Sequence, residues 1–212
     1  EDHAVLEKKG FLLVDSGATY MDGTTDITRT YPLGPLTEDE KRFYTWTLQS
    51  HIDLAKAVWL DYCECKMIDT IAREPLWRHL INYRCGTGHS VSFVGNVHEG
   101  PHALNGRNTT RMRPGMIVTD EPGVYETDLV GIRIENELVC VHRADNQYGT
   151  FLGFEPLMFV PIATSPILPG VLDKDEIAWL NDYHRQVFAK LAPHLNDEER
   201  SWLAEKCAAI GC

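Results

Sequence analysis

Two stretches of this chain have the pattern of β-hairpins, yet both carry acidic residues where strands usually have few. The first is VDSGATYMDGTTDITRT, residues 14–30, which contains Asp15, Asp22 and Asp26. Asp is depleted from strands, so carboxylates kept there need an explanation. The hairpins themselves favour a fold that is built on an antiparallel sheet.

The second hairpin combines GMIVTDEPGVYE with VGIRIENELVCVH, joined by residues 127–130. If its turn centres on Asp128, Glu121 lies directly opposite Glu135. Opposed side chains of an antiparallel pair are about 4.5–5.5 Å apart at Cβ. Two carboxylates at that separation are well placed to share cations.

The first hairpin allows the same arrangement. Asp15 faces Asp26 if the turn centres between Tyr20 and Met21. The Asp22-Gly23 dipeptide favours a turn one or two residues later. We therefore expect a bulge in this hairpin and interpret Asp22 as a turn residue.

Two opposed carboxylate pairs would repel each other unless cations neutralise them. A pair of divalent metal ions, bridged by carboxylates, solves this problem. The nine histidines of the chain supply candidates for a nitrogen ligand, above all His89, which follows Gly86-Thr87-Gly88, and His98. An oxygen-rich set with one imidazole favours manganese, cobalt, iron or zinc over calcium.

The remaining pattern predicts alternating groups of strands and helices, and hence an α+β fold. Helices are expected at about 37–59, where Thr37 and Glu40 form a capping box, at about 65–80, and in the tail at 173–190 and 196–209. A further strand is expected in FLGFEPLMFVPI, residues 151–162.

Charge and composition exclude several classes of partner. The net charge of -11 gives no basic face for nucleic acid or an anionic membrane. No apolar run approaches the ~18 residues of a membrane span, and no signal peptide is visible. The six cysteines match no disulfide or zinc pattern, which predicts reduced thiols in a cytoplasmic protein.

Four blocks of the sequence, in order, resemble aminopeptidase P. They are LLVDSGATYMDGTTDITRT, GTGHSVSF followed by NVHEGP, VTDEPGVYE and GIRIEN. This family is the Xaa-Pro aminopeptidase branch of the pita-bread metallopeptidases, which also include prolidase and methionine aminopeptidase. The resemblance covers residues 11–162 and extends to the helical tail. It implies the pita-bread fold, a curved antiparallel sheet flanked by helices.

The resemblance assigns a role to each candidate residue. It implies that two divalent ions, with manganese favoured and cobalt, zinc or iron as alternatives, are held by five ligands: Asp15, Asp26, His89, Glu121 and Glu135. Glu121 also serves as general base and acid, and His98 hydrogen-bonds the substrate carbonyl or its oxyanion. The strand positions give two further expectations. Arg133, two residues before Glu135 on the same strand face, is expected to pair with Asp26 or the substrate, with a plain structural salt bridge as the alternative, and Thr28, on the same side of its strand as Asp26, is expected to support the ligands with its hydroxyl.

Three departures from the family pattern stand out. Cys85 occupies the position of a family histidine that lines the substrate site, and Ser90 and Ser92 replace glycines after the ligand histidine. The family's first segment, with another substrate histidine, falls before Glu1. We therefore expect residues 1–212 to be a catalytic domain that lacks its N-terminal segment, with residues 173–212 as a helical extension of that domain.

The leading functional hypothesis is a dinuclear metal aminopeptidase that releases an N-terminal residue from peptides with proline second. The homologous alternative is a prolidase that acts on Xaa-Pro dipeptides. Two others are a non-catalytic peptide-binding module of the same fold and an inactive piece of an active enzyme. A homodimer is a further expectation from the family.

Overall fold

The computed structural model describes residues 5–211 and has an α+β architecture, as predicted. Its strands are β1 Phe11–Tyr20, β2 Gly23–Pro32, β3 Val58–Leu60, β4 Gly88–His89, β5 Ala103–Leu104, β6 Ile117–Asp120, β7 Gly123–Glu126, β8 Val130–Arg133, β9 Asn136–Asn146 and β10 Gly149–Pro156. Its helices are α1 Glu38–Ala55, α2 Cys65–Trp77, α3 Lys174–Leu191 and α4 Asp197–Lys206, with a 3₁₀ turn at Ala192–His194.

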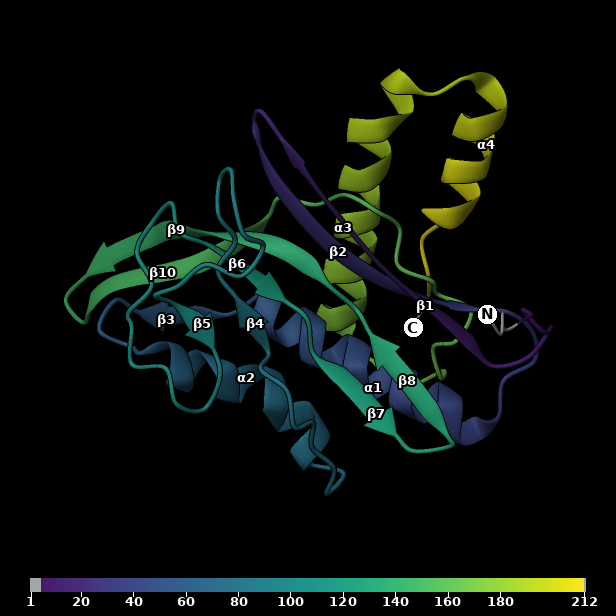
Figure 1. Cartoon of the computed structure of the whole chain (residues 1–212), viewed down its shortest axis with the longest axis horizontal. Coiled ribbons are helices and arrows are strands. Elements are labelled where there is room, and N and C mark those ends of the chain that lie inside the picture. The colour runs from purple at the N-terminus through teal and green to yellow at the C-terminus, as the bar shows by residue number, and fades with distance from the viewer. Residues whose placement is uncertain (1–4, 212) are drawn as a thin grey trace.

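The strands form one four-stranded sheet, in the order β3-β10-β9-β6, and three two-stranded sheets, β1-β2, β4-β5 and β7-β8. All described pairings are antiparallel. Helices α1 and α2 lie along one side of the curved assembly (Figure 1). A core joins them to the large sheet through Leu54 of α1, Ala72 of α2, Val118 of β6 and Leu152 of β10.

Helix α1 begins as the sequence predicts and ends earlier. Thr37 and Glu40 form the expected capping box. The helix stops at Ala55 instead of residue 59, because residues 58–60 form the edge strand β3 against β10. Helix α2 also ends before the predicted residue 80, since Leu80 adopts a left-handed conformation with φ of 59°.

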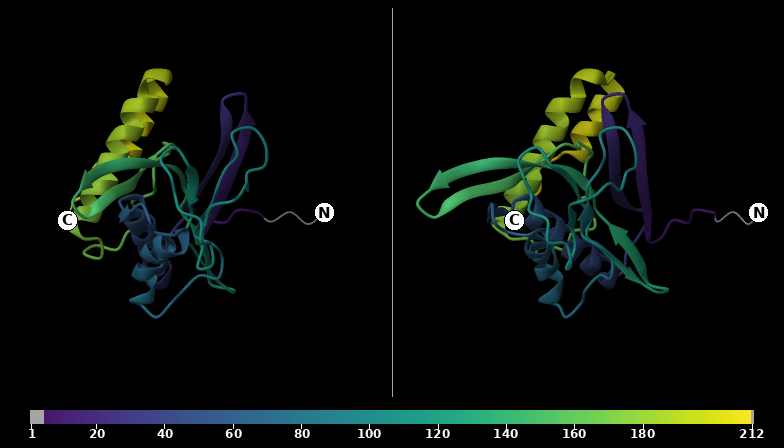
Figure 2. Two further views of the ribbon diagram at one scale, coloured as in Figure 1. Left: turned by 90° about the vertical axis from the view of Figure 1, so that its left-hand side faces the viewer. Right: turned by 60° about the vertical axis from the view of Figure 1, so that its left-hand side comes forward.

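The helical tail packs on the other side of α1. A second core joins Leu48 and Ile52 of α1 to Leu180 and Val187 of α3 and to Ile132 of β8. Helix α4 starts at the predicted N-cap, where Asn196 forms a capping box with Glu199. Helices α3 and α4 therefore stand as an antiparallel pair beside the sheets (Figure 2).

The register of the first hairpin differs from our expectation. Tyr20 pairs with Gly23 across a two-residue turn, and the ladder runs without a bulge to the Phe11–Pro32 pair. Asp15 therefore lies opposite Thr28, and Asp26 lies opposite Gly17, so the predicted facing of the two aspartates is wrong. The turn residues are Met21 and Asp22, so the turn lies one residue later than our expectation and one residue earlier than a turn on Asp22-Gly23. Both aspartates still point to one face of the hairpin, as diagonal neighbours.

None of the helices within residues 5–211 is both long and apolar enough to cross a bilayer. The five cysteines that the structure describes are free thiols, in agreement with the absence of a disulfide pattern.

Candidate metal centre

The second hairpin has the predicted register, and Glu121 lies opposite Glu135 in it. On one side of this pair Asp120 is paired with Asn136, and on the other Gly123 is paired with Arg133. The ladder is interrupted between these two pairs, where β6 gives way to β7 and β8 to β9. The interruption leaves the backbone amides of Glu121 and Glu135 available for hydrogen bonds with other segments of the chain.

The two glutamates use this freedom to join separate parts of the chain. The Glu121 amide donates to the Thr87 carbonyl at 2.8 Å, and the Glu135 amide donates to the Thr28 carbonyl at 3.0 Å. The first bond brings in the glycine-rich segment that carries His89, and the second brings in β2. Residues from three distant segments therefore meet at one point.

The side chains at this point form a compact cluster. Asp26, His89 and Glu135 each offer a ligand atom, and all three atoms lie within 4.8 Å of one another. His89 Nε2 is 3.5 Å from Asp26 Oδ2 and 3.3 Å from Glu121 Oε1. Four of the five residues in the predicted ligand set are thus adjacent.

Hydroxyl groups hold these carboxylates in place. Thr28 Oγ1 donates to Glu135 Oε2 at 2.6 Å, which confirms the predicted supporting hydroxyl. Thr119 Oγ1 donates to Glu121 Oε1 at 3.1 Å and accepts the His89 amide at 3.0 Å. A second threonine, which the sequence analysis did not identify, therefore links His89 to Glu121.

The electrostatics of the cluster favour added positive charge. Burial, followed by the negative charge of Glu121, raises the pKa of Glu135 to about 8. Burial also raises the pKa of Glu121. Burial alone would lower the pKa of His89, but hydrogen bonds with Asp26 and with the Ser90 carbonyl raise it. A cation would offset the burial and the repulsion that raise the pKa values of these carboxyl groups.

Asp15, the fifth predicted ligand, forms an ion pair with Arg133. Arg133 also donates to Thr28 Oγ1 at 3.0 Å and to the Tyr125 hydroxyl at 2.6 Å, and its Nε is 3.8 Å from Glu121 Oε2. The expected pairing with Asp26 is therefore replaced by one with Asp15. Arg133 adds a single fixed positive charge at the rim of the cluster.

His98 lies against the cluster, as its predicted role requires. Its ring centroid is 3.8 Å from that of His89, with the two planes inclined at 48°. The side chain is exposed to solvent. An accessible imidazole beside the clustered carboxylates can donate a hydrogen bond to a bound ligand.

Arg29 supports the cluster from behind and was not predicted. It is 3% exposed, and its guanidinium donates to the carbonyls of Thr28 and Glu135 and to Asn136 Oδ1. The same group donates to the Tyr183 hydroxyl of α3 at 2.9 Å. The helical tail is thereby connected to the backbone that carries Glu135. Only tertiary contacts show this role.

Helix α2 fixes the segment that leads to His89. The Arg73 guanidinium forms an ion pair of 2.8 Å with Asp69, and donates to the carbonyls of Tyr83 and Cys85 at 2.9 Å each. Thr87 donates to Asp69 from the other direction. Cys85, which departs from the family pattern, is exposed, and its backbone belongs to this network.

The donor set fits divalent cations. Four carboxylates, from Asp15, Asp26, Glu121 and Glu135, face only Arg133 and the His89 imidazole as positive partners within the part of the chain that the structure describes. Carboxylate oxygens with one imidazole nitrogen suit manganese, iron, cobalt or zinc.

Comparison with known proteins agrees with this geometry. The model of metallopeptidase family M24 matches residues 1–142, and that of the C-terminal region of peptidase_M24 matches residues 150–210. This chain belongs to metallopeptidase family M24. Its curved antiparallel sheet with flanking helices is the pita-bread fold of that family.

Similar sequences carry aminopeptidase names. The chain is 41% identical to "Aminopeptidase P1" of Lotus japonicus over 100% of its own length and 33% of that protein. It is 43% identical to "Aminopeptidase P2" of Arabidopsis thaliana over 93% of its length and 29% of that protein. The chain thus spans about a third of the length of these M24 relatives.

Solved structures give the same result. An X-prolyl aminopeptidase from Caenorhabditis elegans, titled a cytosolic enzyme with a di-nuclear active site, matches with a TM-score of 0.88 and 39% identity. That match covers 93% of this chain and 33% of the worm protein. Prolidase from Pyrococcus furiosus matches at a TM-score of 0.60 and 28% identity, over 70% of this chain and 41% of that protein.

Proposed function

We propose that this chain carries the catalytic site of a dinuclear metal-dependent Xaa-Pro aminopeptidase, which hydrolyses the bond between an N-terminal residue and proline. The observation that carries the proposal is the convergence of Asp26, His89 and Glu135 within 4.8 Å, with Glu121 3.3 Å from His89. The names of the similar aminopeptidases support the peptide specificity.

Five residues would hold the two ions: Asp15, Asp26, His89, Glu121 and Glu135. Manganese is the ion that we favour. The ions, when bound, would lower the pKa of water and polarise a carbonyl group. Asp15 and Asp26 are diagonal neighbours on one face of the β1–β2 hairpin, which supports a shared role as ligands.

The other steps belong to the protein. Glu121 accepts a proton from the attacking water and passes it to the leaving amine as general base and acid. Its position supports this role, because Thr119 fixes one of its oxygens. His98 donates a hydrogen bond to the substrate carbonyl and to the oxyanion that develops there. Arg133 orients Asp15 through their ion pair and would contact the substrate.

We further propose a cytosolic location and a homodimer, with residues 173–212 as a helical extension of the catalytic domain. The contact between Arg29 and Tyr183 supports that domain arrangement, because it binds α3 to the metal strand.

Peptide assays separate this function from its alternatives. With added Mn²⁺, the chain should release arginine from Arg-Pro-Pro and leave Gly-Pro intact. A Glu135→Gln variant should lose activity while keeping its fold. Turnover of Gly-Pro alone would assign the chain to the prolidase type. Metal binding without turnover of either peptide would mean that the chain is an inactive piece or a binding module.

A further inference from the structure

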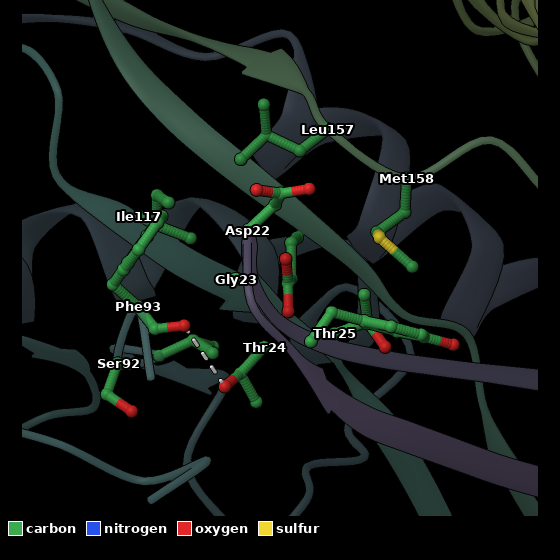
Figure 3. Close-up of a pocket in the computed structure, with 12 residues that line it drawn as sticks. Asp22, Gly23, Thr24, Thr25, Ser92, Phe93, Ile117, Leu157 and Met158 are labelled. Carbon is green, nitrogen blue, oxygen red and sulfur yellow. Dashed lines mark hydrogen bonds between the residues drawn. The ribbon is translucent and has the colours of Figure 1, made fainter. Parts of the chain in front are cut away.

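A cavity of about 440 Å³ lies where the tip of the β1–β2 hairpin diverges from the sheet (Figure 3). The hairpin tip lines one side of it, the loop after His89 another, and the segment after β10 a third. The Thr24 hydroxyl donates to the Phe93 carbonyl at 3.4 Å and thus links the tip to the loop. Apolar side chains, including Ile117, Leu157 and Met158, form most of the walls.

Two buried polar side chains that line this cavity have an atom without a hydrogen-bond partner among the described residues. Glu137 is 4% exposed and its Oε1 is unpartnered. Ser92 is 9% exposed and its hydroxyl is likewise unpartnered. Buried polar atoms almost always have partners, because leaving one unpaired costs about 1–3 kcal/mol. Two such atoms in one cavity indicate a missing hydrogen-bonding group.

The charge of the cavity defines that group. Its only ionisable acids are Glu137 in the wall and Asp22 at the exposed hairpin tip, and none of its lining residues is Lys, Arg or His. A buried carboxylate without a basic partner favours a cationic ligand. The net charge of -11 also favours cations over anions near the protein as a whole.

The rim suits the same kind of ligand. Tyr20 and Phe93 line the cavity and are 61% and 69% exposed, respectively. Aromatic rings bind ammonium and guanidinium groups through their faces and also cover aliphatic chains. Apolar walls with a few polar groups at fixed positions are typical of ligand sites.

We propose that this cavity binds an aliphatic chain that ends in an ammonium or guanidinium group. Glu137 accepts hydrogen bonds from the cationic head, Ser92 accepts another, and Leu157 and Met158 contact the aliphatic part. The ligand is either a basic side chain of a peptide or a free amine of the same chemistry.

The position of the cavity favours the peptide. Thr24 and Thr25 line it and directly precede Asp26 in β2, and Glu137 follows Glu135 by two residues. We therefore expect that a peptide bound at the metal cluster can insert the side chain of an adjacent peptide residue into the cavity. This assignment rests on the proposed function, whereas the binding of a free amine does not.

The test uses NMR spectroscopy of the isotopically labelled chain in the presence of excess Mg²⁺, a diamagnetic ion that competes with the amine for the carboxylates of the metal cluster. Agmatine, which carries a guanidinium and an ammonium group, is titrated against pentanol, an uncharged aliphatic chain, in the wild type and in the Glu137→Gln and Ser92→Ala variants. Glu155→Gln, at an exposed acid of β10, is the matched control. Arg-Pro-Pro and Ala-Pro-Arg are titrated in parallel with their norleucine counterparts.

Agmatine should shift the amide signals of Thr24, Phe93 and Leu157 saturably and bind at least tenfold more weakly to Glu137→Gln, while Glu155→Gln matches the wild type. Ser92→Ala should weaken binding to a smaller extent. If the arginine peptides bind more tightly than the norleucine peptides, and Glu137→Gln abolishes this difference, the ligand is a basic side chain of a peptide. If the peptides show no such difference while agmatine still binds, the ligand is a free amine.

Equal binding of agmatine and pentanol, equal binding to the wild type and Glu137→Gln, or no saturable shifts at the cavity would overturn the proposal. Shifts confined to Glu121 and Gly131 would place the amine at the metal cluster and would also overturn it. None of these outcomes depends on hydrolysis, so they are distinct from failure of the proposed function.

Discussion

The Thr28 hydroxyl donates a hydrogen bond of 2.6 Å to Glu135 Oε2, although 107 residues separate the two in the chain. The bond fixes the carboxylate at the point where the second hairpin is interrupted. It also leaves the other oxygen of Glu135 free to face Asp26 and His89. Supporting contacts of this kind commonly set the affinity of a metal site.

Replacement of Thr28 by valine should therefore weaken Mn²⁺ binding by about 10–100-fold, because Glu135 loses its orientation. Isothermal titration calorimetry measures the affinity directly. Thr28→Ser keeps the hydroxyl and should bind Mn²⁺ nearly as well as the wild type. Equal affinities for the valine variant and the wild type would show that the hydrogen bond does not orient a ligand.

The contact between Tyr183 and Arg29 should make a large contribution to stability. The Tyr183 hydroxyl accepts from the buried guanidinium at 2.9 Å and from the Val160 amide at 3.2 Å. Tyr183→Phe leaves both donors without this acceptor. The free energy of unfolding should fall by about 1–3 kcal/mol in urea denaturation.

Tyr148→Phe provides the control, because Tyr148 is 74% exposed. It should leave the free energy of unfolding unchanged. If Tyr183→Phe is as stable as the wild type, the tail is held to the metal strand by apolar packing alone.

His184 should make the protein less stable in mild acid. The ring is buried, and its Nε2 accepts the Ile162 amide at 3.1 Å. Burial, followed by the charge of Arg29, lowers the pKa of His184 from 6.5 to about 4. Below pH 6.5 the unfolded chain binds a proton that the folded protein excludes, so stability falls with decreasing pH down to about 4.

Between pH 7 and pH 5 this residue should cost about 2 kcal/mol of unfolding free energy. Urea denaturation at both pH values measures the loss, which should be smaller by that amount in His184→Asn. His142→Asn, at an exposed position, should keep the full loss. An unchanged loss in His184→Asn would mean that the ring is protonated in the folded protein.

The sequence was sufficient to predict the second hairpin and most of the cluster. Its register follows from the turn at Asp128, which adopts the left-handed conformation with φ of 59°. The prediction that Asp15 and Asp26 lie directly opposite each other is wrong. Two ligands of one metal centre need only lie on the same face of the hairpin, and diagonal neighbours meet that requirement. Parity of spacing predicts the face, whereas the Asp22-Gly23 dipeptide does not identify the observed turn residues, Met21 and Asp22.

Other features depend on contacts that no local pattern encodes. Strand β3 forms because β10 offers it an edge, in a stretch that by itself continues a helical pattern. The contacts of Arg29 involve a segment more than one hundred residues away, and the cavity beside Glu137 is lined by separate parts of the chain. Tertiary packing overrides local propensity at such positions.

The central claim is that the clustered carboxylates and His89 hold two divalent metal ions. Anomalous diffraction at the manganese edge, from crystals of the chain grown with Mn²⁺, tests it most directly. The account predicts two anomalous peaks enclosed by Asp15, Asp26, His89, Glu121 and Glu135, and their loss in a Glu135→Gln variant. A map without peaks at this cluster under saturating Mn²⁺ would contradict it.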